Sequence, residues 1–494
     1  MVVALDGAQA AGSILIRARR QQRYGRCLLR LTILGLGPGP AELLTQQAVA
    51  VLHSAGEVYL RTAVHPTTAG LPTHLEVHSF DHLYQQLPSF EAVYAAIVDE
   101  VWRLAERPEG VVYAVPGHPL VAEATVQALL QRARAEGQTA TVVAGLSFIE
   151  PALTAVGVDP FSASGGGLQL VDALAPDIDP ARPALVGQVY SREAASHLKL
   201  ELLELYPAEH PVTLVIAAGC PEQRVLVLPL YQLDREPALD HLTCLYVPAL
   251  ALVENVASFR GLLDIVAKLR APDGCPWDRE QTHESLKPYL IEEAYEALEA
   301  LEQGDLDSLQ EELGDLLLNI LLHCQIAAEN GDFSAREAIR GIAEKLVRRH
   351  PHVFGDVQVA SSAEVVQNWE AIKSKERAER TSMLKGLPKS LPALAYTRSL
   401  HERLSQLGLP IEQGLAASAL ATDLGRRLFS LAVQAAGAGE NPEEVLRHAN
   451  TSFRQAFERL EALAWEQGST VQDLPVTERA ALWDQVWRAG EPSV

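Results

Sequence analysis

The pattern of apolar residues changes once along this chain, near residue 250, and the change separates two kinds of structure. Before it, short β-branched or apolar runs alternate with helical stretches rich in Ala, Leu, Glu and Gln. Such alternation is typical of sheets covered by helices. After it, apolar residues recur at i, i+3 and i+4, as in amphipathic helices. The sequence therefore predicts a multidomain chain that is α/β in its first half and all-α in its second.

The length of the chain and changes in its composition suggest further domain limits. At about 150 residues per domain, 494 residues suggest about three domains. The first 30 residues hold six Arg and a single acid, Asp6, and we interpret them as a basic flexible extension. The predicted segments are the extension 1–29, the α/β domain 30–250, a helical domain 254–380 and a second helical domain 385–490. The predicted strands of the α/β domain are 30–36, 110–115, 139–143, 211–217 and 225–230, and a helix is predicted over 42–54.

Composition excludes several classes of partner. The 41 Lys and Arg against 63 Asp and Glu give a net charge of −22, which argues against binding to a nucleic acid polymer or to anionic lipid. The five cysteines lie far apart without a C-x-x-C pair, as expected for a cytoplasmic protein. No run of 18 apolar residues predicts a membrane span.

The acidic residues are concentrated in one segment. Ten acids and no Lys or Arg lie between 291 and 315. Glu293 and Glu296 are three residues apart, as are Glu312 and Asp315, so each pair shares a helix face. The stretch 302–307 is a turn signal, and two antiparallel helices would bring the pairs together. Four carboxylates would repel one another unless a cation lay between them, and Mg²⁺ is the divalent ion that prefers such oxygen ligands.

A solvated acidic helix face is the alternative interpretation, since charge runs are usually just that. Two features weigh against it. No Lys or Arg at i+4 compensates the acids, and the pairs sit directly on strongly apolar helices such as 316–321.

The spacing resembles a known family. E-E-x-x-E, fifteen residues and then E-x-x-D is similar to the signature of the MazG-type nucleoside triphosphate pyrophosphohydrolases, all-α enzymes that bind Mg²⁺. Three more segments resemble the family in the same order and extend the resemblance over roughly 255–380: C-P-W-D at 275–278, R-R-H-P-H at 348–352 and N-W at 368–369.

This resemblance implies a role for each matching residue. Glu293, Glu296, Glu312 and Asp315 would be the metal ligands, and Glu292 a supporting acid. Lys345, Arg349 and Lys373 would hold the triphosphate, and Trp369 would contact the nucleotide. The catalytic residues would then be Glu292, Glu293, Lys345 and Arg349. The implied reaction is NTP + H₂O → NMP + diphosphate.

The region 385–490 resembles the same module in layout but departs from it where the acids stand. The segment that opens with Thr422 aligns with the one that opens with Glu311, and Arg426 then replaces Asp315. Ser452 and Ala456 stand where the first copy has Lys345 and Arg349. We expect a degenerate copy without a metal site, and a homo-oligomer, most simply a dimer, formed through the helical modules.

The α/β half begins with a glycine-rich turn, G-L-G-P-G-P at 35–40, between a predicted strand and a predicted helix. A tight strand–helix turn accounts for it without any ligand. Together with V-P-G-H-P at 115–119 and A-G-L-S at 144–147, however, it resembles the tetrapyrrole methylase family. That resemblance implies a two-lobed fold that binds S-adenosylmethionine in its cleft, lined by Gly37, Gly39, Gly117 and His118. The segment Y-L-R-T-x-x-H-P at 59–66 stands where those methylases usually show a tyrosine–aspartate pair, which puts methyl transfer to a tetrapyrrole in doubt.

Three hypotheses follow from these patterns. The first is a Mg²⁺-dependent nucleoside triphosphate pyrophosphohydrolase whose site lies in the first helical module. The second is an S-adenosylmethionine-dependent methyltransferase with a regulatory helical tail. The third is a protein whose two halves bind nucleotides or cofactors without turnover.

Overall fold

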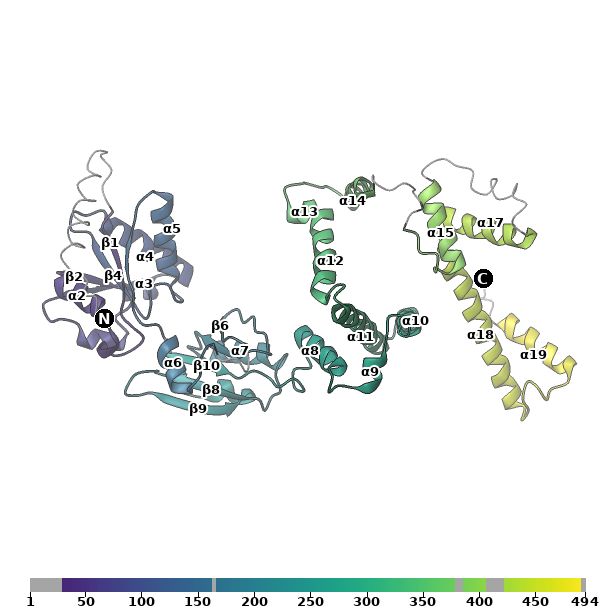
Figure 1. Cartoon of the computed structure of the whole chain (residues 1–494), viewed down its shortest axis with the longest axis horizontal. Coiled ribbons are helices and arrows are strands. Elements are labelled where there is room, and N and C mark those ends of the chain that lie inside the picture. Colours follow the sequence, from purple (N-terminus) through teal and green to yellow (C-terminus); the bar gives the residue numbers. More distant parts are fainter. Residues whose placement is uncertain (1–28, 162–165, 378–383, 385, 406–421, 490–494) are drawn as a thin grey trace. The chain divides into compact units, whose positions relative to one another are not determined.

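The structure is a computed structural model, and it describes residues 29–161, 166–377, 384, 386–405 and 422–489 (Figure 1). The predicted extension 1–29 lies outside this range except for Leu29. The chain forms two compact units, residues 1–338 and 339–494, which are described separately below. The domain limits given above stay predictions.

The first lobe of the α/β part is a five-stranded parallel sheet with helices on both faces. Its spatial order is β3 (Glu76–Ser79), β2 (Glu57–Leu60), β4 (Val111–Val115), β1 (Leu31–Gly35) and β5 (Thr141–Val143). Side chains of α4 (Phe90–Ala105) and α5 (Ala124–Ala135) form one apolar core with the sheet, and those of α2 (Gln46–Ser54) form another. A short helix, α3 (Asp81–Gln86), precedes α4. A parallel sheet needs such double coverage because both of its faces are apolar.

The second lobe is a five-stranded mixed sheet. Its order is β6 (Gln169–Asp172), β7 (Ala184–Gly187), β10 (Thr243–Val247), β8 (Pro211–Ile216) and β9 (Arg224–Pro229). Only β6 and β7 pair in parallel. Side chains of α7 (Arg192–Leu203) lie in one apolar cluster with this sheet, and those of α6 (Ile149–Val156) in another.

All five predicted strands overlap an observed strand, while β2, β3, β6, β7 and β10 were not predicted. The predicted helix over 42–54 begins later than expected. A short 3₁₀ turn occupies Ala41–Leu43, and α2 starts only at Gln46. Thr45 is the N-cap residue of α2, because its hydroxyl accepts the amide hydrogen of Ala48.

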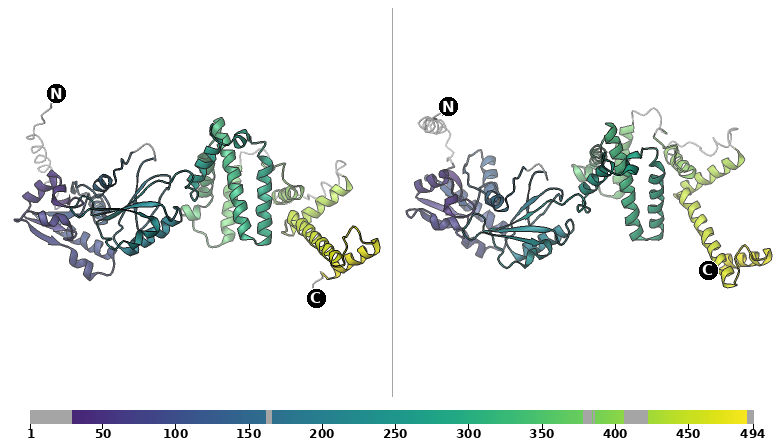
Figure 2. Two further views of the ribbon diagram at one scale, coloured as in Figure 1. Left: turned by 90° about the horizontal axis from the view of Figure 1, so that it is seen from below. Right: turned by 60° about the horizontal axis from the view of Figure 1, so that its bottom comes forward.

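From residue 259 onward, every described element is helical, as predicted (Figure 2). In the first unit these elements are α8 (Phe259–Arg270), α9 (Pro276–Glu280), α10 (Lys287–Gln303) and α11 (Leu306–Asn330). Helix α12 (Ala335–Arg349) begins in the first unit and ends in the second. The second unit continues with α13 (Pro351–Phe354), α14 (Ser362–Arg377), α15 (Ala393–Leu404), α17 (Asp423–Gly437), α18 (Pro442–Glu466) and α19 (Val476–Ala489). Among the described residues, no helix combines the length and apolar content needed to cross a bilayer.

The acidic segment forms the predicted helical hairpin. Helices α10 and α11 pack against each other across a two-residue connection. Gly304 ends α10 with φ of +70°, a left-handed conformation that favours glycine, and the Asp305 side chain caps α11. Leu321, Leu322 and Ile326 of α11 are buried in one cluster with Val266 of α8.

Arg270, at the end of α8, holds the segment that contains α9 against the hairpin through hydrogen bonds and an ion pair. Its side chain is 6% exposed and forms an ion pair with Glu329 of α11, with Nη2 2.7 Å from Oε2. Its Nη1 donates to the carbonyl oxygens of Asp278 and Gln281. One guanidinium therefore joins α8, the end of α9 and the far end of α11.

The last helices form a separate apolar cluster. Ala456, Leu460 and Ala464 of α18 are buried with Leu482 and Val486 of α19. Helices α15 and α17 pack against each other, as α10 and α11 do. The second helical region therefore has its own core.

Candidate active site

Three of the four predicted metal ligands meet between the two helices of the hairpin. Glu293 and Glu296 project from α10 and Glu312 from α11. One carboxylate oxygen from each of these residues lies within 4.8 Å of the other two. That separation suits ligands that surround one small divalent ion, because Mg²⁺ binds oxygens at about 2.1 Å.

The carboxylates repel one another. The pKa of Glu293 is raised by partial desolvation and by the negative charges of Asp315, Glu296 and Glu312. The pKa of Glu312 is also raised, by desolvation and by Glu296, Glu311 and Asp315. A cation at this point would relieve the repulsion. Asp315, the fourth predicted ligand, is therefore close enough to act on both residues, although it is outside the trio that meets within 4.8 Å.

Asn319 lies one helical turn after Asp315 and was not predicted. It is 5% exposed, and its Nδ2 donates to the Asp315 carbonyl oxygen at 3.1 Å. Its Oδ1 is buried without a hydrogen-bond partner. A single amide within the apolar run from Leu316 to Leu322 was the sequence signal for it.

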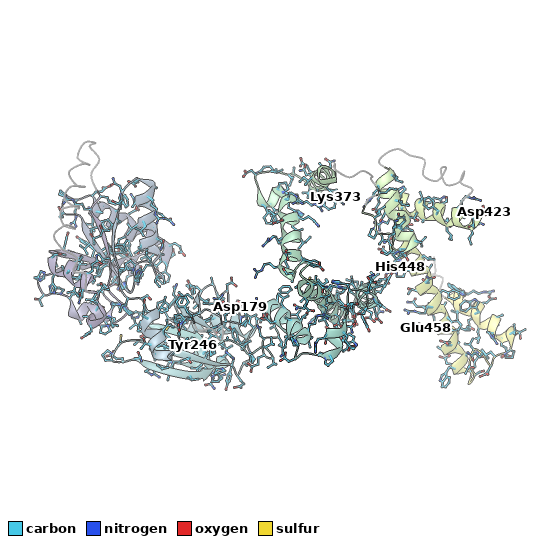
Figure 3. All side chains as sticks on the ribbon, in the orientation of Figure 1. Asp179, Tyr246, Lys373, Asp423, His448 and Glu458 are labelled. Atoms are coloured by element: carbon cyan, nitrogen blue, oxygen red, sulfur yellow. The ribbon has the colours of Figure 1, made fainter. Side chains whose placement is uncertain are left out.

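Glu292 precedes Glu293 on α10, is exposed, and is not part of the trio. The predicted cations lie in the second unit: Lys345 and Arg349 on α12, and Lys373 on α14. Figure 3 labels Lys373 on its helix. There the Lys373 ammonium lies 4.2 Å from the ring centre of Trp369, and the Arg349 guanidinium 5.8 Å from it. Arg349 and Lys373 therefore lie near the same Trp369 ring, and we call these two side chains the cationic group.

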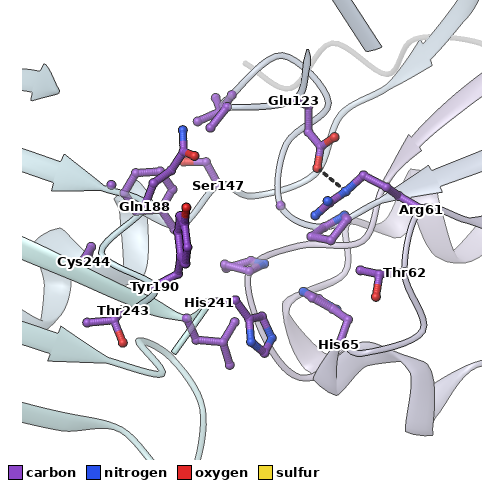
Figure 4. A pocket seen from close by; sticks show the side chains of 18 of the residues that line it. Arg61, Thr62, His65, Glu123, Ser147, Gln188, Tyr190, His241, Thr243 and Cys244 are labelled. Atoms are coloured by element: carbon purple, nitrogen blue, oxygen red, sulfur yellow. Dashed lines mark ion pairs between the residues drawn. The ribbon is translucent and has the colours of Figure 1, made fainter. Parts of the chain in front are cut away.

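A second candidate site is a cavity of about 810 Å³ between the two lobes of the α/β part (Figure 4). Arg61 and His65 line it from the first lobe and Tyr190 and His241 from the second. Of the four residues expected here, Gly117 and His118 line the cavity. Gly37 and Gly39 are not among its lining residues, and the intervening Pro38 is.

The backbone packs closely at the ends of β1, β4 and β5, next to Gly117, which lines the cavity. A Cβ atom on Gly35 would lie 2.6 Å from the Gly117 carbonyl oxygen and 2.7 Å from the Gly145 amide nitrogen. Gly37 and Gly117 also bond to each other, each amide donating to the other's carbonyl oxygen. The amides of Gly37 and Gly117 are therefore already paired with backbone carbonyl oxygens.

Arg61 and Glu123 form a mostly buried ion pair at the edge of the cavity. Nε of Arg61 lies 2.9 Å from Oε1 of Glu123, whose side chain is 6% exposed. Burial raises the pKa of Glu123 to about 7, against the opposing attraction of Arg61. Glu123 was not predicted as a site residue.

The comparisons with known proteins agree with both halves of this structure. A tetrapyrrole (corrin/porphyrin) methylase profile covers residues 30–234, and a MazG nucleotide pyrophosphohydrolase profile covers residues 281–354. A nucleoside triphosphate pyrophosphohydrolase/pyrophosphatase MazG from Thermotoga maritima is 39% identical over 245 residues, which are 46% of this chain and 94% of that protein. The chain belongs to the MazG family. The nucleoside triphosphate pyrophosphohydrolase of Escherichia coli K12 is 35% identical over 252 residues, which are 46% of this chain and 96% of that protein.

The combination of a methylase-like part with a MazG part also has a precedent. The uncharacterized protein YabN of Bacillus subtilis is 37% identical over 491 residues, which are 92% of this chain and 98% of that protein. Among solved structures, a uroporphyrin-III C-methyltransferase from Thermus thermophilus is 23% identical with a TM-score of 0.35, over 44% of this chain and 91% of that one. The methylase profile and the two-lobed α/β structure agree on the fold of the first half.

Proposed function

We propose that the chain is a Mg²⁺-dependent nucleoside triphosphate pyrophosphohydrolase that converts NTP and water to NMP and diphosphate. The observation that supports this most is the convergence of Glu293, Glu296 and Glu312 on a point between two helices. The relatives from Thermotoga maritima and Escherichia coli are named nucleoside triphosphate pyrophosphohydrolases. We propose the same substrate class for this chain.

The donor set fits Mg²⁺, because it consists only of carboxylate oxygens on a partly exposed surface that water and phosphate can reach. Glu293, Glu296 and Glu312 would hold the ion, with Asp315 beside them. Bound there, Mg²⁺ would orient phosphate oxygens and lower the pKa of a bound water. A carboxylate of the cluster would accept the proton from the attacking water.

The cationic group in the second unit would serve the triphosphate. Arg349 and Lys373 both lie near the Trp369 ring, so their charges are held close together. Guanidinium and ammonium groups bind phosphate oxygens, which acidic residues alone would repel. Lys345 lies one turn before Arg349 on α12 and would extend this group.

Methyl transfer is the less favoured function. The cavity presents the guanidinium of Arg61 together with the carboxylates of Glu91, Glu123 and Asp240, so its charge does not decide for or against S-adenosylmethionine. The amides of Gly37 and Gly117 each donate to the other residue's carbonyl oxygen and offer no donor to a cofactor. The paired glycine amides therefore argue against S-adenosylmethionine at this turn.

The test is release of diphosphate from each NTP and dNTP in the presence of Mg²⁺. We expect Glu293→Gln and Asp315→Asn each to abolish turnover, with far-UV circular dichroism unchanged. Turnover at the wild-type rate in both variants would contradict the proposal. Glu280→Gln, on the exposed α9, is the matched control and keeps full activity.

We also propose that a second copy of the chain covers the apolar face of α12. Ile339, Ile342, Leu346 and Val347 of this helix are each about half exposed. Exposed apolar patches of this kind mark contact surfaces. Sedimentation equilibrium is expected to give twice the chain mass, and Ile342→Asp is expected to give the single-chain mass. A wild-type monomer at micromolar concentration would contradict this part.

A further inference from the structure

Two histidine rings form a hydrogen-bonded pair beside the acidic hairpin. Nδ1 of His283, in the segment before α10, lies 2.8 Å from Nδ1 of His323 on α11. The ring planes differ by 7°, and the ring centres are 5.1 Å apart. Rings that lay face to face would be about 3.5–4 Å apart, so these two rings meet at their edges through the Nδ1 atoms. We call His283 and His323 the imidazole pair.

The His323 ring depends on this one hydrogen bond. In the part of the chain that the structure describes, its other nitrogen, Nε2, is buried without a hydrogen-bond partner. One Nδ1 atom of the pair must carry the shared proton, and the other must accept it. Because a buried polar group without a partner is costly, loss of the bond would destabilise the contact between the two rings.

The imidazole pair lies where the beginning of α10 is attached to α11. Thr282 and Ser285 form a closed turn there, since the amide of each donates to the hydroxyl of the other. Leu286, which follows the turn, is 1% exposed and is buried in one cluster with Leu321 of α11. The beginning of α10 is therefore attached to α11 by the hydrogen bond of His283 and by the apolar contact of Leu286.

The acidic half of α10 has little other support. Both buried residues of this helix, Ala297 and Ala300, come after Glu296. Every side chain in the stretch 287–296 is exposed or only partly buried. The position of Glu293 and Glu296 over α11 therefore depends on the contacts at the two ends of this stretch, and the imidazole pair is one of the contacts at its beginning.

The hydrogen bond of the pair exists only while one of the two rings is neutral. A first proton gives an imidazolium, which can still donate to the neutral ring. A second proton puts N–H groups on both Nδ1 atoms, which removes the bond and sets two like charges side by side. Burial and then the charge of His283 lower the pKa of His323 from its ordinary value of 6.5. The neutral ring is therefore favoured above pH 6.5 and is lost as the pH falls through this lowered pKa.

Other charged side chains near the pair have partners of their own. Arg270 of α8 pairs with Glu329 of α11, and Lys287 of α10 pairs with Glu284. The other charged residues of α8 and α9 are Arg260, Asp264, Lys268, Asp278, Arg279 and Glu280. Of all these described groups, none contributes to the pKa shift of His323, which comes from burial and His283.

We propose that the imidazole pair is a pH-sensitive positioning device for the metal site. Its hydrogen bond holds the beginning of α10 on α11 and so sets the separation of Glu293 and Glu296 from Glu312. Mg²⁺ requires nearly ideal octahedral geometry from its oxygen ligands, so a small movement of α10 weakens its binding. The inference rests on the metal site of the proposed function and adds control of that site by pH.

The experiment measures the binding of Mg²⁺ alone to the full chain by isothermal titration calorimetry, without nucleotide. At about pH 7.5, His323→Leu removes the bond and is expected to weaken Mg²⁺ binding about tenfold or more, as loss of a group that orients metal ligands does. Asparagine places an amide where Nδ1 of histidine lies, so His323→Asn is expected to keep the wild-type affinity within about threefold.

The pH dependence distinguishes this role from a merely structural one. Between about pH 7.5 and about pH 5.5, Mg²⁺ affinity is expected to fall about tenfold further in the wild type than in His323→Asn, which has no second imidazole to protonate. The carboxylates of the site are the same in both proteins, so their own protonation affects both equally.

Two further variants serve as controls. Cys324→Ala alters a 7% exposed neighbour of His323 on α11, so it is expected to lower the melting temperature and to leave Mg²⁺ affinity and its pH dependence unchanged. The double variant of His283→Leu with His323→Leu is expected to bind Mg²⁺ no more weakly than either single variant, because each alone removes the shared bond. Far-UV circular dichroism checks the helices of every variant.

The outcomes separate this inference from the proposed function. Absence of Mg²⁺ binding by the wild type would overturn the metal site and the role of the pair together. Equal Mg²⁺ affinity of the wild type and His323→Leu would overturn the positioning role and leave the proposed function in place. A parallel fall of affinity with pH in the wild type and His323→Asn would overturn the control by pH.

Discussion

The two helical regions of this chain contain similar pairs of packed helices but differ in what those helices present. In the first, α10 and α11 bring Glu293, Glu296 and Glu312 to one point. In the second, α15 and α17 also pack together, yet Arg426 stands at the position aligned with Asp315 and pairs with Asp423 at 3.8 Å. The comparison teaches that both regions keep a packed helix pair, whereas, in the part of the chain that the structure describes, converging carboxylates occur only in the first.

A second difference concerns the basic residues. In the sequence alignment, Arg349 of α12 corresponds to Ala456 of α18. Ala456 is 2% exposed and belongs to the apolar cluster between α18 and α19. The same aligned position is therefore part of the apolar core in the second region, as Ala456, and carries a positive charge in the first region, as Arg349.

The largest expected effect separates the acids of the two regions. Glu312→Gln is expected to lower kcat for NTP hydrolysis by about 1,000-fold or more, because it removes a carboxylate from the proposed metal site. Asp423→Asn, at the aligned position of the second region, is expected to leave kcat unchanged. Steady-state assays of diphosphate release measure both. If the two variants lost activity equally, the second region would have to be part of the catalytic site.

The next effect exchanges a residue between the regions. Ala456→Arg is expected to destabilise the second region by about 3 kcal/mol or more, because it puts a charge into an apolar cluster. Gln455→Arg, at the exposed neighbouring position, is the control and is expected to cost little. Urea unfolding followed by circular dichroism measures the difference. Equal stability of the two variants would show that Ala456 is not part of a packed core.

Metal binding gives a smaller but selective effect. At about 100 times its dissociation constant, Mg²⁺ is expected to stabilise the first unit by about 2.7 kcal/mol. Calorimetry with and without EDTA should show this gain in the wild type and lose it in Glu312→Gln. Asp423→Asn should keep the gain, since no acid trio was found among the described residues of the second region. A Mg²⁺-independent wild-type melting profile would contradict the metal site.

The smallest expected effect concerns the cations near Trp369. Arg349→Ala is expected to raise KM for NTP about tenfold with little change in kcat, because it removes a phosphate contact and leaves the acids intact. Its fold should persist, since α12 buries no residue. Arg340→Ala, an exposed arginine earlier on α12, is the control. An unchanged KM would remove Arg349 from the proposed substrate contacts.

Much of the fold was accessible from the sequence, for local reasons. The runs at β1 and β4 are almost wholly buried, so their apolar character is continuous and easily recognised. Strand β3 has no fully buried residue and β6 alternates between half-buried and exposed positions, and both contain only four residues. Short edge strands depend on pairing with neighbours that are distant in sequence, which no local pattern records.

The candidate sites divide in the same way. The carboxylate cluster was predictable because each acid pair is three residues apart on a helix, and a single turn joins the two helices. Glu123 was missed because its partner, Arg61, is far away in the sequence and only the folded sheet brings them together. Asn319 was hidden in an apolar run, where its burial rather than its spacing makes it notable.

The close packing of Gly35, Gly117 and Gly145 has a consequence for how this protein can diversify. A Cβ atom on Gly35 or Gly145 would collide with backbone atoms of the neighbouring loops, and Gly117 has φ of +67°, so side chains at these positions would strain the carboxyl ends of β1, β4 and β5. The chemical character of the cavity can instead change at lining side chains such as Arg61 or Tyr190, without any change in this backbone. Descendants of one scaffold could acquire new ligands by one or two replacements there, while the backbone beneath them stays the same.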